Sequence, residues 1–162
     1  MSVAAPLLRL RDLTKHFYQP GSLLRQRTPP VKAVDGVTLD VGAGEIFALV
    51  GESGSGKSTL GRLVLRLLDP TTGAMTFDGQ TIDLAAGVPV DYRKNVQIVF
   101  QDSRASLNPR RTAYQILRDP MLLHGVATQK TARAEAAALL ERVGLAPAER
   151  FLDRYPRQFS GG

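Results

Sequence analysis

The feature that most constrains the fold is the octapeptide Gly51-Glu52-Ser53-Gly54-Ser55-Gly56-Lys57-Ser58, which fits the pattern G-x-x-x-x-G-K-[ST] without a substitution. A continuous apolar run at residues 46–50 precedes it and predicts a strand buried on both faces. We expect the helix that follows to end at Asp69, before Pro70. Its apolar face would consist of Leu60, Leu63, Val64, Leu67 and Leu68. Strand, glycine-rich loop and helix thus follow one another in the order that a phosphate-binding loop requires.

The residue types in this octapeptide explain how it would bind a nucleotide. Glycines at positions 51, 54 and 56 let the backbone turn tightly and bring its N–H groups against phosphate oxygens. Lys57 would supply a mobile positive charge to the β- and γ-phosphates, and the Ser58 hydroxyl is placed to ligate Mg²⁺. The positive end of the helix dipole adds to this attraction. The alternative is a glycine-rich turn that binds nothing, and the strand and helix on either side argue against it.

Composition and charge exclude several other classes of protein. With 43% apolar and 22% charged residues among 162, the chain has the composition and length of one soluble globular domain. No apolar run approaches the ~20 residues that cross a bilayer, and we expect no secretory signal. The absence of cysteine excludes disulfides and thiolate metal sites. The net charge of +6 comes from scattered basic residues, which disfavours nucleic acid as the main partner and fits a basic surface, facing either solvent or anionic lipid headgroups.

The first hundred residues predict a β-rich part. Asp78-Gly79 lies between two short segments and indicates a hairpin, because this pair accepts the positive φ angles of a tight turn. Gln101 follows an expected strand, at the end where open α/β sheets place ligand-contacting residues, although a solvated loop residue is the commoner role for such a glutamine. The other expected segments are strands at residues 7–13, 37–41 and 96–100, an irregular insertion at 19–30 and a turn at 71–73.

The remainder of the sequence is helical in character. A short helix is expected at residues 112–119, ended by Pro120. An alanine-rich helix is expected at residues 129–143, with Gly144 as its C-terminal cap. Pro147 could start a further short helix. These helices predict a second part whose packing differs from that of the β-rich part.

The chain closes with Gln158-Phe159-Ser160-Gly161-Gly162. The glycine-rich loop, Gln101 at 50 residues after Gly51, and this closing Ser-Gly-Gly together resemble the ATP-binding subunits of ABC transporters, over nearly the whole chain. The resemblance implies an α/β fold: a P-loop NTPase core with an antiparallel β subdomain and a helical subdomain. It also implies ATP and Mg²⁺ as cofactors. We expect the nucleotide-binding core at residues 1–101 and the helical subdomain at residues 102–162.

The family's nucleotide-binding residues carry over to matching positions. Phe17 matches the aromatic residue that stacks on adenine, with Tyr18 as the alternative. Gln101 matches the glutamine that senses Mg²⁺ and the γ-phosphate, so it joins Ser58 as a candidate metal ligand. The full set of nucleotide-binding candidates is Phe17, Gly51, Glu52, Ser53, Gly54, Ser55, Gly56, Lys57, Ser58, Thr59 and Gln101.

The closing residues resemble the signature motif of the same family. By that resemblance, Ser160, Gly161 and Gly162 would contact the ATP held by a partner subunit, so that two subunits enclose two nucleotides. A hydroxyl and free N–H groups at a helix start would form such an anion site. Phe159 stands where the family usually has Leu and keeps an apolar anchor.

Four stretches closely resemble ATPase subunits of oligopeptide and dipeptide importers: residues 31–37, 51–54, 99–102 and 106–110. By this resemblance the transported substrate would be a peptide, with nickel and glutathione importers as close relatives. The implied partners are a second ATPase subunit, membrane permease subunits and, indirectly, a substrate-binding protein. The implied location is the cytoplasmic face of the cell membrane.

The later motifs of the family are not found in these 162 residues: neither an apolar strand ending in Asp-Glu nor the switch histidine is present. Both histidines, His16 and His124, precede the closing motif and are expected to be inert. We therefore expect a chain truncated before the Walker B strand, with no complete catalytic set, that binds phosphate without hydrolysing ATP and exposes apolar strand edges. The alternatives are a soluble ABC ATPase acting on nucleic acid or ribosomes, against which residues 106–110 argue, and a non-hydrolysing interaction fragment.

Overall fold

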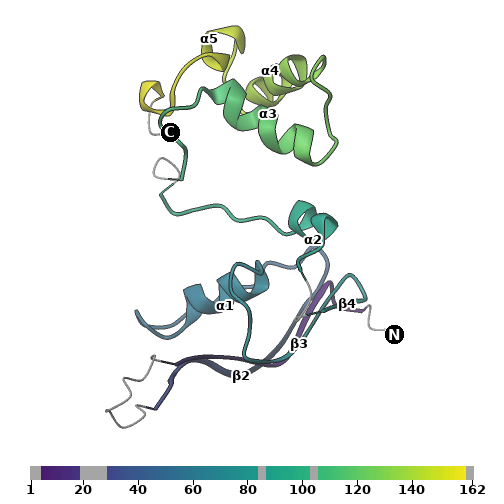
Figure 1. Cartoon of the computed structure of the whole chain (residues 1–162), viewed down its shortest axis with the longest axis vertical. Helices are drawn as coiled ribbons and strands as arrows, with labels where there is room; N and C mark the ends of the chain where they lie inside the picture. Colours follow the sequence, from purple (N-terminus) through teal and green to yellow (C-terminus); the bar gives the residue numbers. More distant parts are fainter. Residues whose placement is uncertain (1–4, 19–28, 84–86, 103–105, 160–162) are drawn as a thin grey trace. The chain divides into compact units, whose positions relative to one another are not determined.

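The computed structural model describes residues 5–18, 29–83, 87–102 and 106–159. The chain divides into two compact units, Met1–Val96 and Gln97–Gly162 (Figure 1). The first unit contains a sheet and two helices, and the second unit is helical. The assignment of a nucleotide-binding core to residues 1–101 and of a helical subdomain to residues 102–162 remains a prediction.

The sheet of the first unit is antiparallel, with strand order β2-β1-β3-β4. Its strands are β1 (Leu8–Phe17), β2 (Val31–Val41), β3 (Thr72–Phe77) and β4 (Gln80–Ile82). The hairpin predicted around Asp78-Gly79 is confirmed, because these two residues join β3 to β4 with φ angles of 47° and 73°. The sheet therefore accounts for the antiparallel β subdomain expected from the sequence.

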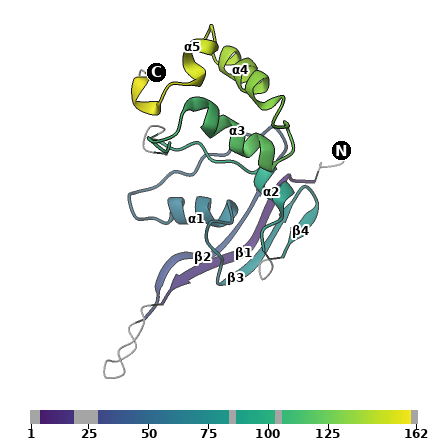
Figure 2. The ribbon, with the colours of Figure 1, turned by 45° about the horizontal axis from the view of Figure 1, so that its top comes forward.

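Helix α1 (Lys57–Val64) packs against the sheet and forms the core of the first unit (Figure 2). Leu60 and Leu63 are its buried residues, as the apolar spacing predicts. The short helix α2 (Val90–Asn95) adds Tyr92, whose ring meets Phe77 edge-on and whose hydroxyl donates to the Val64 carbonyl. Burial raises the pKa of Tyr92 to about 12. The core consists of Leu10, Leu13, Val34, Leu60, Leu63, Met75, Ile82 and Tyr92.

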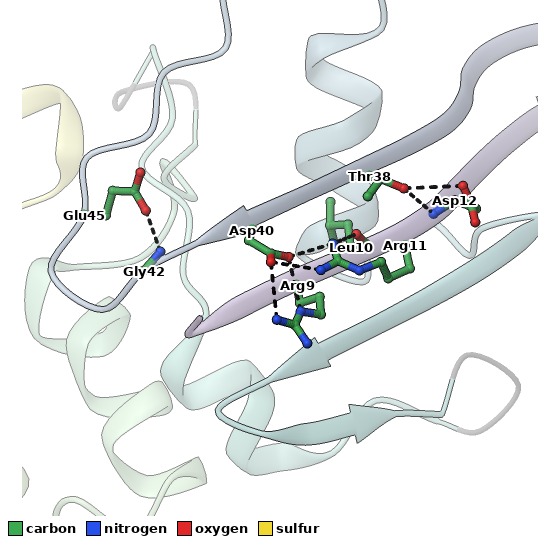
Figure 3. Close-up of polar contacts among 8 residues, drawn as sticks. All are labelled: Arg9, Leu10, Arg11, Asp12, Thr38, Asp40, Gly42 and Glu45. Atoms are coloured by element: carbon green, nitrogen blue, oxygen red, sulfur yellow. Dashed lines mark hydrogen bonds and ion pairs between the residues drawn. The ribbon is translucent and has the colours of Figure 1, made fainter. Parts of the chain in front are cut away.

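Polar side chains link β1 to β2 (Figure 3). The guanidinium groups of Arg9 and Arg11 both lie against the Asp40 carboxylate, at 3.3 Å and 2.7 Å. The Asp12 backbone N–H donates to the Thr38 hydroxyl at 2.9 Å. Hydrogen bonding from Arg11, and less strongly from Arg9, lowers the pKa of Asp40 below its ordinary value. The two longest strands are thus joined by charge as well as by their backbones.

The strands expected at residues 46–50 and 96–100 are not observed, so these two predictions were wrong. Ile46 and Val50 are 97% and 93% exposed, and Val99 is 94% exposed. The physical reason is that the sheet formed by the described residues ends at β2 and β4, and neither run pairs with it. A backbone without a neighbouring strand cannot complete its hydrogen bonds as a strand. The expectation of exposed apolar surface is confirmed.

Two smaller predictions in the first unit are also corrected. Helix α1 ends at Val64 rather than Asp69, and two residues later the backbone of Arg66 is left-handed with φ of 54°. The expected turn at residues 71–73 is instead the start of β3. There Gly73 has φ of 108°, and a Cβ would come within 2.6 Å of the Leu13 Cα. Only glycine fits β3 this closely against β1.

The second unit consists of α3 (Ala113–Leu123), α4 (Ala132–Arg142), α5 (Glu149–Leu152) and a 3₁₀ turn at Pro156–Gln158. Thr112 begins α3 with a capping box, since its side chain and that of Gln115 each accept the other's backbone N–H. The predicted end at Pro120 was wrong. Proline costs one intrahelical hydrogen bond, yet its own carbonyl accepts the His124 N–H at 3.0 Å, and the next residue, Met121, anchors the helix in the core.

The helix predicted for the alanine-rich segment is observed as α4, but it begins at Ala132, three residues after the predicted start, and ends at Arg142. Gly144 has φ of 83° and donates to the Glu141 carbonyl, while the next N–H, of Leu145, donates to Leu140. This is the Schellman arrangement expected of a C-terminal glycine. The short helix expected after Pro147 is also confirmed as α5. The core of the unit consists of Met121, Ala136, Leu140, Ala148 and Leu152.

Candidate functional site

The glycine-rich loop lies between the exposed run at residues 46–50 and α1. Its backbone takes positive φ angles of 84° at Gly54 and 90° at Gly56, the residue that caps α1. A Cβ on Gly56 would overlap the Ala33 carbonyl oxygen, whereas one on Gly54 would meet nothing within 4 Å. Gly56 is therefore needed for two reasons, its left-handed backbone and its contact with β2.

The Lys57 side chain folds back over this loop. Its ammonium donates to the carbonyl oxygens of Gly51 and Glu52, at 2.8 Å and 2.5 Å, and to the Ser55 hydroxyl at 3.1 Å. These acceptors are neutral, and a charge-assisted bond to a phosphate would be roughly twice as strong. The ammonium is thus held in the loop by partners that an anion can replace.

The start of α1 has the character of an anion site. The first N–H groups of an α-helix have no intrahelical acceptor. In α1 the backbone N–H of Leu60 donates to the carbonyl of Gly56 in the loop, at 2.8 Å. Ser58 is exposed in this first turn, and Thr59 is half-buried. The described residues contain no cluster of three His, Cys, Asp or Glu side chains that could hold a metal by itself. The exposed Ser58 hydroxyl is an oxygen donor of the kind that Mg²⁺ takes alongside water and phosphate ligands.

Two open hollows border the loop and share part of their lining. One, of about 400 Å³, is lined by residues 31–33 of β2 and residues 53–59. The other, of about 410 Å³, is lined by Lys32, Asp35 and other β2 residues, by residues 49–51, and by the end of the loop with Leu60. Both lie within the first unit, and Lys32 lines both. The loop is thus accessible to a ligand from the β2 side.

Phe17 lies at the end of β1 and pairs with Val31, which lines the first hollow. Residues directly opposite in antiparallel strands project to the same side of the sheet, so strand register directs the Phe17 ring toward that side. The ring is 40% exposed, and the Lys15 ammonium lies 5.3 Å from its centroid. Tyr18, the alternative, is 67% exposed. Phe17 is therefore separated from the hollow beside the loop by one residue, its cross-strand partner Val31.

The other predicted site residues belong to the second unit. Gln101 is exposed, in a bend after the run at residues 96–100. Ser160, Gly161 and Gly162 lie outside the described residues. Phe159 is described, and its ring lies 5.9 Å from that of Phe151. Residues 53–59 thus share a hollow with Val31, the strand partner of Phe17, whereas Phe17 itself is not among the residues that line it.

Sequence reasoning missed the contribution of β2 to this site. Lys32 and Ala33 line the hollow, and the Ala33 carbonyl lies against Gly56, although both residues lie more than twenty residues before it. Only the pairing of β2 with β1, and the contact of β2 with α1, bring them there. A pattern confined to consecutive residues carries no signal for such a contribution.

Comparison with known proteins identifies the family. The sequence profile of the ABC transporter family matches residues 34–162, which is most of the chain and includes the loop. The chain belongs to the ABC transporter family. No helix among the described residues is long and apolar enough to span a membrane.

Curated relatives include ATP-binding proteins of two importers. The chain is 44% identical over 158 residues to the oligopeptide transport ATP-binding protein AppF of Bacillus subtilis, covering 96% of this chain and 47% of that protein. It is 46% identical over 158 residues to the glutathione import ATP-binding protein GsiA of Escherichia coli, covering 97% of this chain and 25% of that protein. The chain thus spans about half or less of the length of these relatives.

Solved structures of ATP-binding cassettes have the same fold. A dimeric, post-hydrolysis structure of the cassette MJ0796 bound to ADP and Pi has a TM-score of 0.68 at 26% identity. A second dimeric structure of MJ0796 gives 0.68 at 27%. Each comparison covers 95% of this chain and 63% of the other. The fold expected from the sequence, an ABC ATPase core with antiparallel and helical parts, is confirmed.

Proposed function

We propose that this chain is the nucleotide-binding part of an ATP-hydrolysing subunit that energises a peptide-type importer. The observation that carries the proposal is the loop at residues 51–58, where positive-φ glycines, the start of α1 and the replaceable partners of Lys57 form a cradle for phosphate. The names of the two importer relatives support a peptide or glutathione as the transported substrate.

In this proposal each predicted residue has a defined role. Lys57 binds the β- and γ-phosphates and Ser58 ligates Mg²⁺, while Phe17 stacks on adenine. Gln101 senses the metal and the γ-phosphate. Ser160, Gly161 and Gly162 contact the nucleotide of a second ATPase subunit.

The proposed assembly has three kinds of partner. A second ATPase subunit encloses the nucleotides, and the dimeric cassettes among the solved structures support this pairing. Permease subunits receive the conformational change at the cytoplasmic face of the membrane. A substrate-binding protein delivers the peptide to those permease subunits.

The first test is the affinity of the chain for a fluorescent ATP analogue in the presence of Mg²⁺. Lys57→Ala removes a charged hydrogen-bond donor, so we expect affinity to fall about ten- to a hundredfold. The matched control is Lys94→Ala, which removes an exposed lysine from α2 in the same unit and should bind like the wild type. Equal affinity for the wild type and Lys57→Ala would contradict the proposed phosphate site.

A second test addresses the transported substrate. Cells that lack the whole gene should lose uptake of a labelled oligopeptide and regain it when the gene is restored. Uptake of labelled glutathione, measured in the same cells, distinguishes between the two kinds of importer. Undiminished uptake of both compounds would contradict an importer of either kind.

A further inference from the structure

A polar cluster of three side chains includes two residues that line a hollow beside the loop, Lys32 and Asp35, together with His16. The Asp35 carboxylate accepts from the Lys32 ammonium at 3.1 Å through one oxygen and contacts His16 Nε2 at 3.0 Å through the other. The Lys32 and Asp35 side chains are 59% and 53% exposed, whereas that of His16 is 17% exposed. His16 is held further by its backbone N–H, which donates to the Thr71 hydroxyl at 3.0 Å. The lysine is therefore the mobile member of the cluster.

The position of Lys32 on β2 places it between two parts of the proposed site. Val31, the residue before it, pairs with Phe17, the candidate for stacking on adenine. Ala33, the residue after it, has the carbonyl that lies against Gly56 of the loop. Lys32 itself lines both hollows that border the loop. As a lining residue of both hollows, Lys32 is a basic residue that borders the space between Val31, the partner of Phe17, and the loop.

We propose that Lys32 is a second nucleotide-binding cation. When a nucleotide binds, the Lys32 ammonium moves away from the Asp35 carboxylate and contacts the phosphates nearest the base. This inference rests on the proposed function, because it assumes that residues 51–58 bind the polyphosphate. Four methylene groups carry the ammonium, so it can change partner without disturbing packed residues. The Lys32 ammonium would then exchange the exposed Asp35 carboxylate for a polyphosphate, which carries more negative charge and attracts the ammonium more strongly.

Asp35 has the opposite effect in this scheme. Its carboxylate lines the same hollow as the loop and repels an incoming polyphosphate while also holding Lys32. Loss of the Asp35 charge should therefore strengthen nucleotide binding, whereas loss of the Lys32 charge should weaken it. If the Lys32–Asp35 ion pair only stabilised β2, both changes would alter nucleotide binding with the same sign.

The test is the affinity of the full chain for MgATP and MgADP in a set of matched variants. Lys32→Met keeps most of the stem and removes the charge, and it should bind both nucleotides about three- to tenfold more weakly. Lys32→Arg should remain within about twofold of the wild type, and Asp35→Asn should bind about two- to threefold more tightly. These differences should shrink as ionic strength rises toward about 0.5 M. Lys94→Ala again serves as the control, and circular dichroism verifies that each variant is folded.

Several results would overturn the inference. Binding by Lys32→Met that equals the wild type would exclude a role in recognition. Weakening by both Lys32→Met and Asp35→Asn would assign the pair to structure alone. If Lys57→Ala loses affinity while both Lys32 variants bind like the wild type, the proposed function stands and only this inference fails. If the wild type binds neither nucleotide, both fail.

Discussion

Strand β1 and the run at residues 46–50 both lie in segments that the sequence predicts as strands, yet they have opposite environments. Leu10 and Leu13 of β1 are 0% and 1% exposed, whereas Ile46 and Val50 of the run are 97% and 93% exposed. Strand β1 has β2 on one side and β3 on the other, and α1 covers the face that Leu10 and Leu13 bury. The run pairs with none of the four described strands.

The difference shows that an apolar segment forms a strand only where a neighbouring strand pairs with its backbone and a surface packs against its side chains. Strand formation requires a neighbour for each backbone N–H and C=O group, and burial requires a surface to pack against. Strand β1 has both among the described residues, and the run has neither. The sequence predicts a strand in both segments, and tertiary context decides that only β1 forms one.

The largest test of this comparison is truncation of one residue from each segment. Leu10→Ala should lower the free energy of unfolding by about 2–5 kcal/mol, because it leaves a cavity between the sheet and α1. Ile46→Ala, the matched change at an exposed residue, should alter it by less than about 0.5 kcal/mol. Both values come from urea denaturation followed by far-UV circular dichroism. Comparable losses in the two variants would mean that residues 46–50 are packed in solution.

The parts of the fold that sequence predicted correctly depend on local chemistry. The Asp78-Gly79 hairpin follows from positive φ angles, and the Gly144 cap follows from a left-handed residue at a helix end. The burial of Leu60 and Leu63 follows from helical spacing. Each of these signals lies within a few consecutive residues, so no distant partner could overturn it.

Several of the incorrect predictions concerned features that distant residues decide. Pro120 was expected to end α3, but Met121 is held in the core of the second unit and the helix continues. The turn expected at residues 71–73 became the start of β3 because β1 lies directly against Gly73. In the candidate site the loop was predictable from its motif, whereas the approach of Ala33 and Lys32 was not.

Alanine substitution should destabilise the protein more at Gly56 than at Gly54, and this is a smaller effect than that of Leu10→Ala. Gly56→Ala forces both a strained backbone and an overlap with the Ala33 carbonyl, so it should destabilise the first unit by about 1–3 kcal/mol. Gly54→Ala meets no atom within 4 Å and should cost only the backbone term, about 1 kcal/mol. Thermal unfolding of the two variants measures the difference. An equal loss of stability would show that β2 does not restrain the loop.

The exposed run should affect self-association more than stability. Replacing Ile46 and Val50 together by lysine should reduce oligomer formation in light scattering, since it places charges in an exposed apolar patch. The free energy of unfolding should change by less than about 0.5 kcal/mol. The control, lysine at Leu123 and Val126, adds the same charge at exposed apolar residues of the second unit. If both pairs reduce association equally, net charge rather than the run is responsible.

The smallest effect concerns the ion pairs that join β1 to β2. Because the pKa of Asp40 is lowered in the folded state, its contribution to stability is present above the ordinary pKa of 3.8 and is lost as pH falls through the lowered value. Arg11 is the larger cause and Arg9 the smaller, so Arg11→Gln should move the Asp40 pKa back toward 3.8 further than Arg9→Gln does. An NMR titration of the Asp40 carboxyl carbon in the two variants measures both pKa values directly.

The reverse order of the two pKa changes would assign the main contact to Arg9 instead. Absence of a change in both variants would mean that solvent already screens these exposed pairs, as it does for many surface salt bridges. In that case the β1–β2 pair would owe its stability to Leu10, Leu13 and the backbone ladder alone. The contrast with residues 46–50 would then depend entirely on burial and strand pairing, and charge would have no part in it.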